Sequence, residues 1–123
     1  MKHKKVDRTQ RIGDLIQKTL ATMLLQDMSD ERFRFVTVTG VVLSRDLGHA
    51  KVYVSVLNDD AKVIEQTVDA LNRAAKPMRY HLAQEVKMRI VPELRFVYDE
   101  STAHGFYISN LIEKANKKQE SEE

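Results

Sequence analysis

A proline between two helical patterns constrains this chain more than any other feature of its sequence. Apolar residues repeat at helical spacing over about 61–75 and again over 78–88, and Ala74-Ala75-Lys76-Pro77 separates the two patterns. Proline donates no backbone hydrogen bond and disfavours helical dihedrals in the residue before it. We therefore predict an interhelical kink here. One helix should stop near Ala75 and another begin at Pro77, with Lys76 extended at its N-cap.

The other periodicities predict one more helix and three strands. Apolar residues recur at helical spacing over 7–28, which predicts an amphipathic helix. Valine, threonine and aromatic residues dominate 33–44 and alternate with polar ones over 50–56. The residues between these runs, 45–48, are typical of a turn, so a β-hairpin is expected. A final alternation over 94–98 predicts a third strand.

This order of elements predicts an α+β domain, αββααβ, with a mixed three-stranded sheet and the helices on one face. If the two helices of the pair cross the sheet in opposite senses, they return the chain to the end where the second strand finished. On that basis we expect the third strand to run antiparallel to the second and parallel to the first.

Length and composition limit the class of protein. The chain has 123 residues, enough for one domain, and no cysteine, which excludes disulfides and thiolate chemistry. We expect the domain to span 1–112, followed by a flexible charged tail over 113–123 that is nearly free of apolar residues. No signal peptide or membrane span is visible, so a cytoplasmic protein is expected.

Positive charge is concentrated in two stretches although the net charge is only +2. Six basic residues stand against two acidic ones over 1–18, and five against one over 73–89. Such segregation is either a solvated face or the electrostatic footprint of a nucleic-acid site. The candidate nucleic-acid-binding residues taken from these stretches are Arg8, Arg11, Lys18, Arg73, Lys76, Arg79 and Lys87.

Two long runs of the sequence resemble a known family. They are Val38 to Asp60, which contains the hairpin, and Arg89 to Asp99, which contains Pro92 and the third strand. Shorter matches open and close the chain, at Arg8-Thr-Gln-Arg11 and Ser109-Asn-Leu-Ile112. Together they closely resemble the bacterial ribosome-binding factor A family over nearly the whole chain.

The resemblance implies a type II KH-like fold, which has the αββααβ order already expected. It also implies a non-enzymatic factor that binds the free small (30S) ribosomal subunit and its rRNA late in maturation, helps rRNA processing and supports cold adaptation. From the residues themselves we expect a monomer with no cofactor, no metal, no catalytic residue, no small-molecule substrate and no membrane contact.

The kink departs from both the KH pattern and the family pattern. No Gly-x-x-Gly occurs in the chain, and Lys76 stands where the family usually has the glycine of an Ala-x-Gly kink. With Lys76 at the N-cap, we expect the backbone N–H groups of Met78 and Arg79 to lack an internal partner. An rRNA phosphate docked there would satisfy them, and so would water or a neighbouring carboxylate.

Two classes of function remain open. The first is an assembly factor whose basic surface docks on ribosomal RNA. The second is a protein-interaction adaptor of the same fold that binds a partner through its open sheet edge or acidic tail. A single aromatic residue on the outer hairpin face, Tyr53, could also stack on a base.

Overall fold

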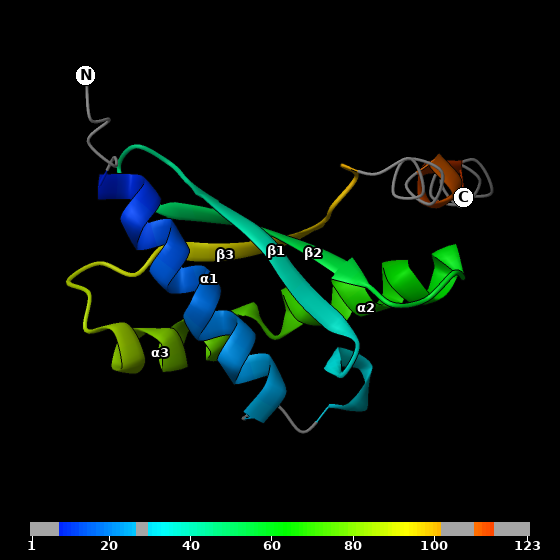
Figure 1. Cartoon of the computed structure of the whole chain (residues 1–123), viewed down its shortest axis with the longest axis horizontal. Coiled ribbons are helices and arrows are strands. Elements are labelled where there is room, and N and C mark those ends of the chain that lie inside the picture. The colour runs from blue at the N-terminus through cyan, green and yellow to red at the C-terminus, as the bar shows by residue number, and fades with distance from the viewer. Residues whose placement is uncertain (1–7, 27–29, 102–109, 115–123) are drawn as a thin grey trace, which may run out of the picture.

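The computed structural model describes residues 8–26, 30–101 and 110–114 (Figure 1). Its elements in chain order are α1 (Arg8–Gln26), the 3-10 helix η1 (Glu31–Phe33), β1 (Val36–Leu43), β2 (His49–Val56), α2 (Ala61–Arg73), α3 (Ala75–Val86) and β3 (Glu93–Tyr98). Residues 110–114 are also helical. The predicted αββααβ order is therefore confirmed, and the tail beyond Lys114 lies outside the described residues.

Local side-chain hydrogen bonds fix where several elements begin. The Asp60 carboxylate caps α2 by accepting from the backbone N–H of Lys62 at 2.9 Å. Asp30 caps η1 in the same way through Arg32 N–H, also at 2.9 Å. The strand predicted from residue 33 begins only at Val36, because Phe33 closes η1 and is buried in the core.

The three strands form one mixed sheet in the order β1-β2-β3. β1 and β2 pair antiparallel, with a bulge between Val38 and Gly40. β2 and β3 pair parallel, from His49 opposite Glu93 to Val54 opposite Tyr98.

The predicted direction of the third strand is wrong, because β3 runs parallel to β2 and antiparallel to β1. Ala74 alone separates α2 from α3, and one residue does not reverse a helix into an antiparallel hairpin. The two helices instead carry the chain back along the sheet to the start of β2, as Figure 1 shows. There the backbone N–H of Glu93 donates to the carbonyl of Gly48 at 2.9 Å.

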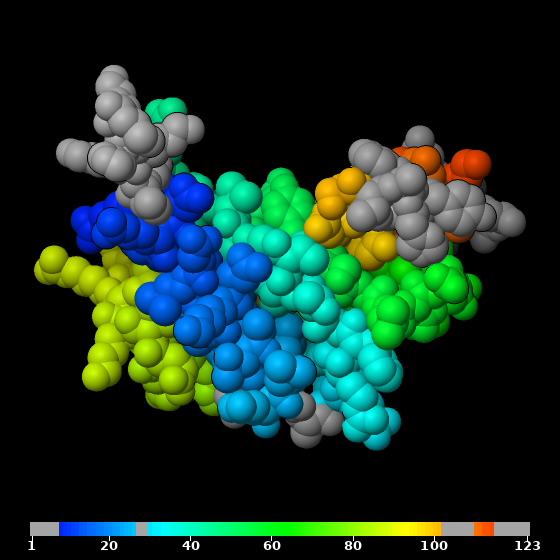
Figure 2. Space-filling view, viewed as in Figure 1, coloured from blue at the N-terminus to red at the C-terminus, as the bar shows by residue number. Residues whose placement is uncertain are grey.

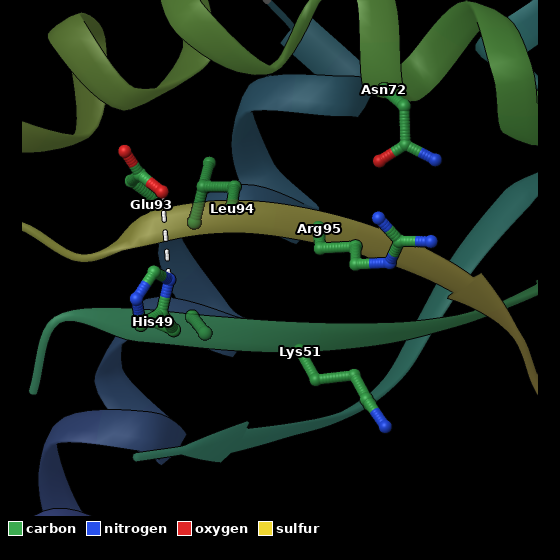
Figure 3. A pocket seen from close by; sticks show the side chains of 7 residues that line it. His49, Lys51, Asn72, Glu93, Leu94 and Arg95 are labelled. Carbon is green, nitrogen blue, oxygen red and sulfur yellow. Dashed lines mark ion pairs between the residues drawn. The ribbon is translucent and has the colours of Figure 1, made fainter.

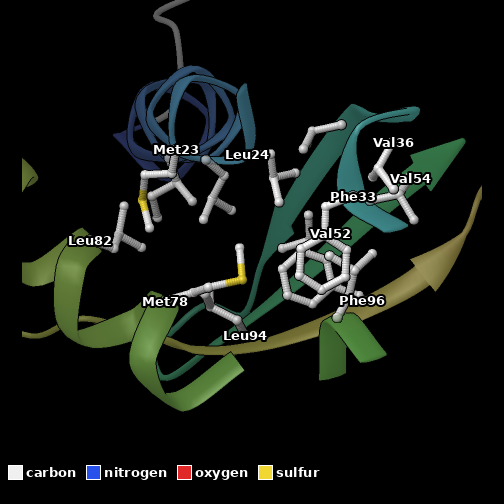
Figure 4. Close-up of a cluster of buried hydrophobic side chains, with 14 of the residues drawn as sticks. Met23, Leu24, Phe33, Val36, Val52, Val54, Met78, Leu82, Leu94 and Phe96 are labelled. Atoms are coloured by element: carbon white, nitrogen blue, oxygen red, sulfur yellow. The ribbon is translucent and has the colours of Figure 1, made fainter. Parts of the chain in front are cut away.

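The core fills the space between the helices and one face of the sheet (Figure 4). α1 packs on β1 and α3, while α2 and α3 pack on β3. Alternate strand residues point into this core and are buried: Val36, Val38, Ala50, Val52, Val54, Leu94 and Phe96. The residues between them face outward, on the side of the sheet opposite α1 and α3.

Candidate nucleic-acid interface

The junction between α2 and α3 lies at Ala74, earlier than the sequence predicts. Ala74 has φ −88° and ψ 1°, and its N–H donates to the carbonyls of Ala70 and Leu71 at 3.0 and 3.1 Å. Lys76 is helical, so its predicted extended N-cap conformation is wrong. Pro77 is the third residue of α3, where no intrahelical acceptor exists for the N–H that proline lacks.

The prediction that the backbone N–H groups of Met78 and Arg79 lack a partner is wrong for Met78. The N–H of Met78 donates to the carbonyl of Ala74 at 3.1 Å, so it has a backbone partner. The guanidinium of Arg79 donates to the carbonyl of Val91 from Nε at 3.1 Å and from Nη2 at 2.8 Å. Arg79 therefore holds α3 against the connection that leads to β3, and its side chain is only half exposed.

Lys76 faces a small hollow of about 240 Å³ beside the junction. Arg79 lines this hollow together with Ala75, and Glu93 at the start of β3 lines it from the other side. The sequence places no acidic residue near the junction, but the fold brings Glu93 there from 17 positions further along the chain. This carboxylate lowers the positive potential around Lys76.

The candidate cations of α1 are exposed on the side of the helix away from the core. Arg8 and Arg11 lie at the start of α1, and Lys18 lies two turns later on the same side as Arg11. The opposite side of α1 buries Ile16, Leu20, Met23 and Leu24. α1 thus presents a mainly basic outer side, on which the exposed Asp14 lies between Arg11 and Lys18, because its apolar stripe is fixed to the sheet and α3.

α1 and the α3 region adjoin on one side of the molecule, in blue and yellow-green in Figure 2. Lys87 ends α3 in the left-handed conformation, with φ 52°, and is exposed. Arg73 and Lys76 are exposed at the opposite end of α3. The fold therefore divides the seven candidates into a group on α1, a group at the α2–α3 junction and Lys87.

None of the seven candidates takes part in an ion pair with another residue of the described ranges. Arg32 forms an ion pair there with Asp30 at 2.7 Å, and His49 lies 3.5 Å from Glu93, a contact that is ionic only when His49 is protonated. Cations without a carboxylate partner remain available to phosphate oxygens.

Sequence reasoning missed two further cations, Lys51 on β2 and Arg95 on β3. They are direct partners in the parallel pairing of these strands, and both are exposed. The strand alternation already indicated that each faces outward. Their neighbourhood could not be inferred because the third strand was expected to run the other way.

Two carboxylates outside the basic surface are held in local networks. The pKa of Asp46 is lowered by the Ser44 hydroxyl, which donates at 2.7 Å, and by the Gly48 N–H at 2.9 Å. The pKa of Asp99 is lowered by the Thr39 hydroxyl and by the Ser101 N–H at 2.9 Å. Among the described residues, histidine and acidic side chains form no cluster of metal-binding size, and no helix is long and apolar enough to span a bilayer.

Comparison with known proteins identifies the family. The family model for ribosome-binding factor A matches residues 8–112. Ribosome-binding factor A of Pseudomonas fluorescens (strain Pf-5) is 47% identical over 113 residues, which cover 91% of this chain and 85% of that protein.

Solved structures agree with the sequence match. The crystal structure of ribosome-binding factor A from Thermus thermophilus gives a TM-score of 0.65 at 29% identity, covering 75% of this chain and 97% of that one. A homology model of the Thermus thermophilus factor, fitted into an electron cryo-microscopy map of a complex with the 30S particle, gives a TM-score of 0.63 at 30% identity, covering 76% of this chain and 99% of that one. The chain therefore belongs to the ribosome-binding factor A family.

Proposed function

We propose that the protein is a non-enzymatic assembly factor that binds the free 30S particle and its rRNA. It acts during late maturation and rRNA processing in the cytoplasm and supports growth in the cold. The observation that carries the proposal is the group of exposed, unpaired cations on α1, whose positions are fixed by the buried stripe on the other side of the helix. Family membership and the 30S complex of the Thermus thermophilus factor support it.

Phosphate contacts by arginine and lysine account for the mode of binding. Arg8, Arg11 and Lys18 supply one group of such contacts, and Lys87 supplies another at the end of α3. Arg73 and Lys76 make a weaker contribution at the junction, because Glu93 shares the hollow with Lys76. Arg79 adds positive charge there while its guanidinium stays bonded to Val91.

Co-sedimentation of the full chain with free 30S particles, at several salt concentrations, tests the proposal. We expect binding to free 30S particles and not to 70S ribosomes. The double variant Arg11→Ala with Lys18→Ala should reduce the slope of log affinity against log salt by about 0.9 for each phosphate that is no longer bound. Lys62→Ala removes an exposed cation from α2 and serves as the control with an unchanged slope. Equal slopes for all three proteins would contradict the proposal.

Lys76→Ala tests the junction separately in the same assay. If Lys76 binds one phosphate, its removal should again reduce the slope by about 0.9. If the slope does not change, the junction binds no phosphate, and the α1 result decides the proposal alone.

A second candidate function is a protein-interaction adaptor that does not bind RNA directly. A groove of about 460 Å³ between α2 and β3 favours it, because four carboxylates line this groove. They belong to Glu65, Asp69, Glu100 and Glu113. The adjacent open edge of β3 is less suited to a partner strand, because the Asn72 amide already bonds both backbone groups of Phe96. Binding that is indifferent to salt and to ribonuclease treatment would favour the adaptor.

A further inference from the structure

The outer face of the sheet brings two cations together at its β2–β3 pair. Lys51 and Arg95 are directly opposite in register, and neighbouring strands lie about 4.8 Å apart. Both residues alternate with buried core residues, so their side chains leave the sheet on the face opposite the core. Like charges placed opposite each other destabilise a sheet, which makes this pairing unfavourable unless an anion lies between them.

The acidic residue nearest to this pair on the same face is Glu93, two residues before Arg95 on β3, and it lies beside His49. Figure 3 shows the two cations beside His49 and Glu93, which face each other. His49 Nδ1 lies 3.5 Å from Glu93 Oε2, whereas neither Lys51 nor Arg95 forms an ion pair with any described residue. All four side chains line a hollow of about 580 Å³, with Asn72 at its rim.

Arg95 also borders a second hollow, on the α2 side of β3. That hollow is the groove with the four carboxylates of Glu65, Asp69, Glu100 and Glu113. None of them forms an ion pair with Arg95. These carboxylates lower the positive potential on the side of Arg95 that faces α2.

An aromatic side chain lies next to the cation pair on the same face. Tyr53 follows Lys51 by two residues, about 7 Å along β2, and is half-buried. Its partner on β1 is Gly40, beside the bulge, and a Cβ added at Gly40 would meet no atom within 4 Å. A glycine in a strand leaves its cross-strand neighbour without a side chain against it, so one flank of Tyr53 is open.

We propose that this face binds a single-stranded segment of RNA, with a phosphate between Lys51 and Arg95 and a base stacked on Tyr53. The proposal rests on the proposed function and adds a second RNA surface, separate from α1. Two unpaired cations suit the backbone, and an aromatic ring with an open flank suits a base of any identity. The outward residues beside the pair are mixed: Val42 and Val97 lie directly opposite Lys51 and Tyr53 in the register, and Thr37, Thr39 and Ser55 lie further along the face.

Titration of the isotope-labelled full chain with a mixed-sequence 12-nucleotide single-stranded RNA tests this surface without the ribosome. Amide NMR shifts should change most at Lys51, Tyr53 and Arg95. The double variant K51Q with R95Q should reduce the log–log salt slope by about 0.7, which corresponds to the loss of one phosphate contact with a single strand. Tyr53→Ala should weaken binding about 5-fold or more with little change in slope.

Lys62→Gln is the matched control, because it removes one exposed cation from α2 and should leave the slope unchanged. The urea midpoint of the double variant should equal or exceed that of the wild type, since the variant removes a like-charge contact. An unchanged slope for the double variant, or shift changes confined to other surfaces, would overturn the proposal.

The same variants in the 30S co-sedimentation assay separate this proposal from the proposed function. If the wild type binds 30S but the amide shifts of the sheet face do not change with RNA, the RNA surface on the sheet is rejected and the proposed function is not. If those amide shifts change with RNA but the chain does not bind 30S, the assembly function is rejected and the RNA surface on the sheet is not. Loss of 30S binding by the double variant, with no effect on the free RNA, would indicate a protein partner and overturn the RNA assignment.

Discussion

Asn72 holds the outer edge of β3 through both ends of its side-chain amide. Its Nδ2 donates to the carbonyl of Phe96 at 3.0 Å, and its Oδ1 accepts from the N–H of Phe96 at 2.7 Å. Asn72→Asp keeps the shape but places a carboxylate oxygen against the Phe96 carbonyl. We expect a loss of about 1–3 kcal/mol in the free energy of unfolding, measured by urea denaturation at pH 7.

Asn58→Asp is the matched control for this substitution. Asn58 uses only its Oδ1, which accepts from the N–H of Asp60 at 2.8 Å, and an aspartate retains that acceptor. Its effect should stay within about 0.5 kcal/mol. Equal effects of the two substitutions would mean that the Asn72 donor contributes nothing to stability.

Asp46 makes the β1–β2 turn sensitive to acid. The lowered pKa of this carboxyl means that its charged form is favoured in the folded state. Its stabilising contribution is therefore complete above the unfolded-state pKa of about 3.9 and is lost as the pH falls through the lower folded-state pKa. Ser44→Ala removes the largest cause of the shift, so the pKa of Asp46, followed by carboxyl NMR, should rise toward its ordinary value. No change would assign the shift to the Gly48 N–H alone.

Helix α3 ends at a lysine in a conformation that glycine adopts more easily. The left-handed φ of Lys87 costs about 1 kcal/mol for a residue with a side chain. Lys87→Gly should therefore stabilise the protein by about 0.5–1 kcal/mol in urea denaturation, and it should also weaken 30S binding because a cation is removed.

Lys87→Ala separates these two effects. It removes the same charge but keeps a Cβ in the left-handed conformation, so it should weaken binding equally without raising stability. If both variants bind 30S like the wild type, Lys87 is a solvated cation and belongs only to the helix end.

The helix pair shows what periodicity determines and what it does not. Strand alternation and helical spacing are local properties of the sequence. They therefore predicted the order of the elements and the face of each strand that is buried. The direction of β3 depends on the angle between α2 and α3 at Ala74. No single residue type in the sequence determines that angle. Proline suggested a break at its own position, yet the first turn of a helix accepts it, so the break fell at Ala74 instead.

The candidate site was predictable to a similar extent. Exposed cations such as Arg11 and Lys18 follow from the apolar stripe of their own helix, and the structure places both on its outer side. Contacts between distant segments could not be inferred. Arg79 bonds to Val91, and Glu93 reaches the hollow of Lys76, because the chain returns after α3.

At the scale of the whole molecule, cations predominate on the outer side of α1 and carboxylates predominate in the groove between α2 and β3. The outer side of α1 carries Arg8, Arg11 and Lys18, whereas the groove between α2 and β3 carries four carboxylates. Such an arrangement orients the protein in the field of an RNA before contact. We expect the α1 side to approach the RNA first and the acidic groove to lie outside the RNA interface.

Neutralising the groove tests this orientation, because it removes negative charge without adding a phosphate contact. The double variant Glu65→Gln with Asp69→Asn should bind 30S slightly faster and more tightly at low salt, where screening is weak. Its log–log salt slope should match that of the wild type, since the slope counts the phosphates that are contacted. The Arg11→Ala with Lys18→Ala variant should show the opposite combination, with weaker binding and a reduced slope. Weaker 30S binding by the groove variant would mean that the acidic groove itself contacts the particle, through a basic protein segment, and would reverse this orientation.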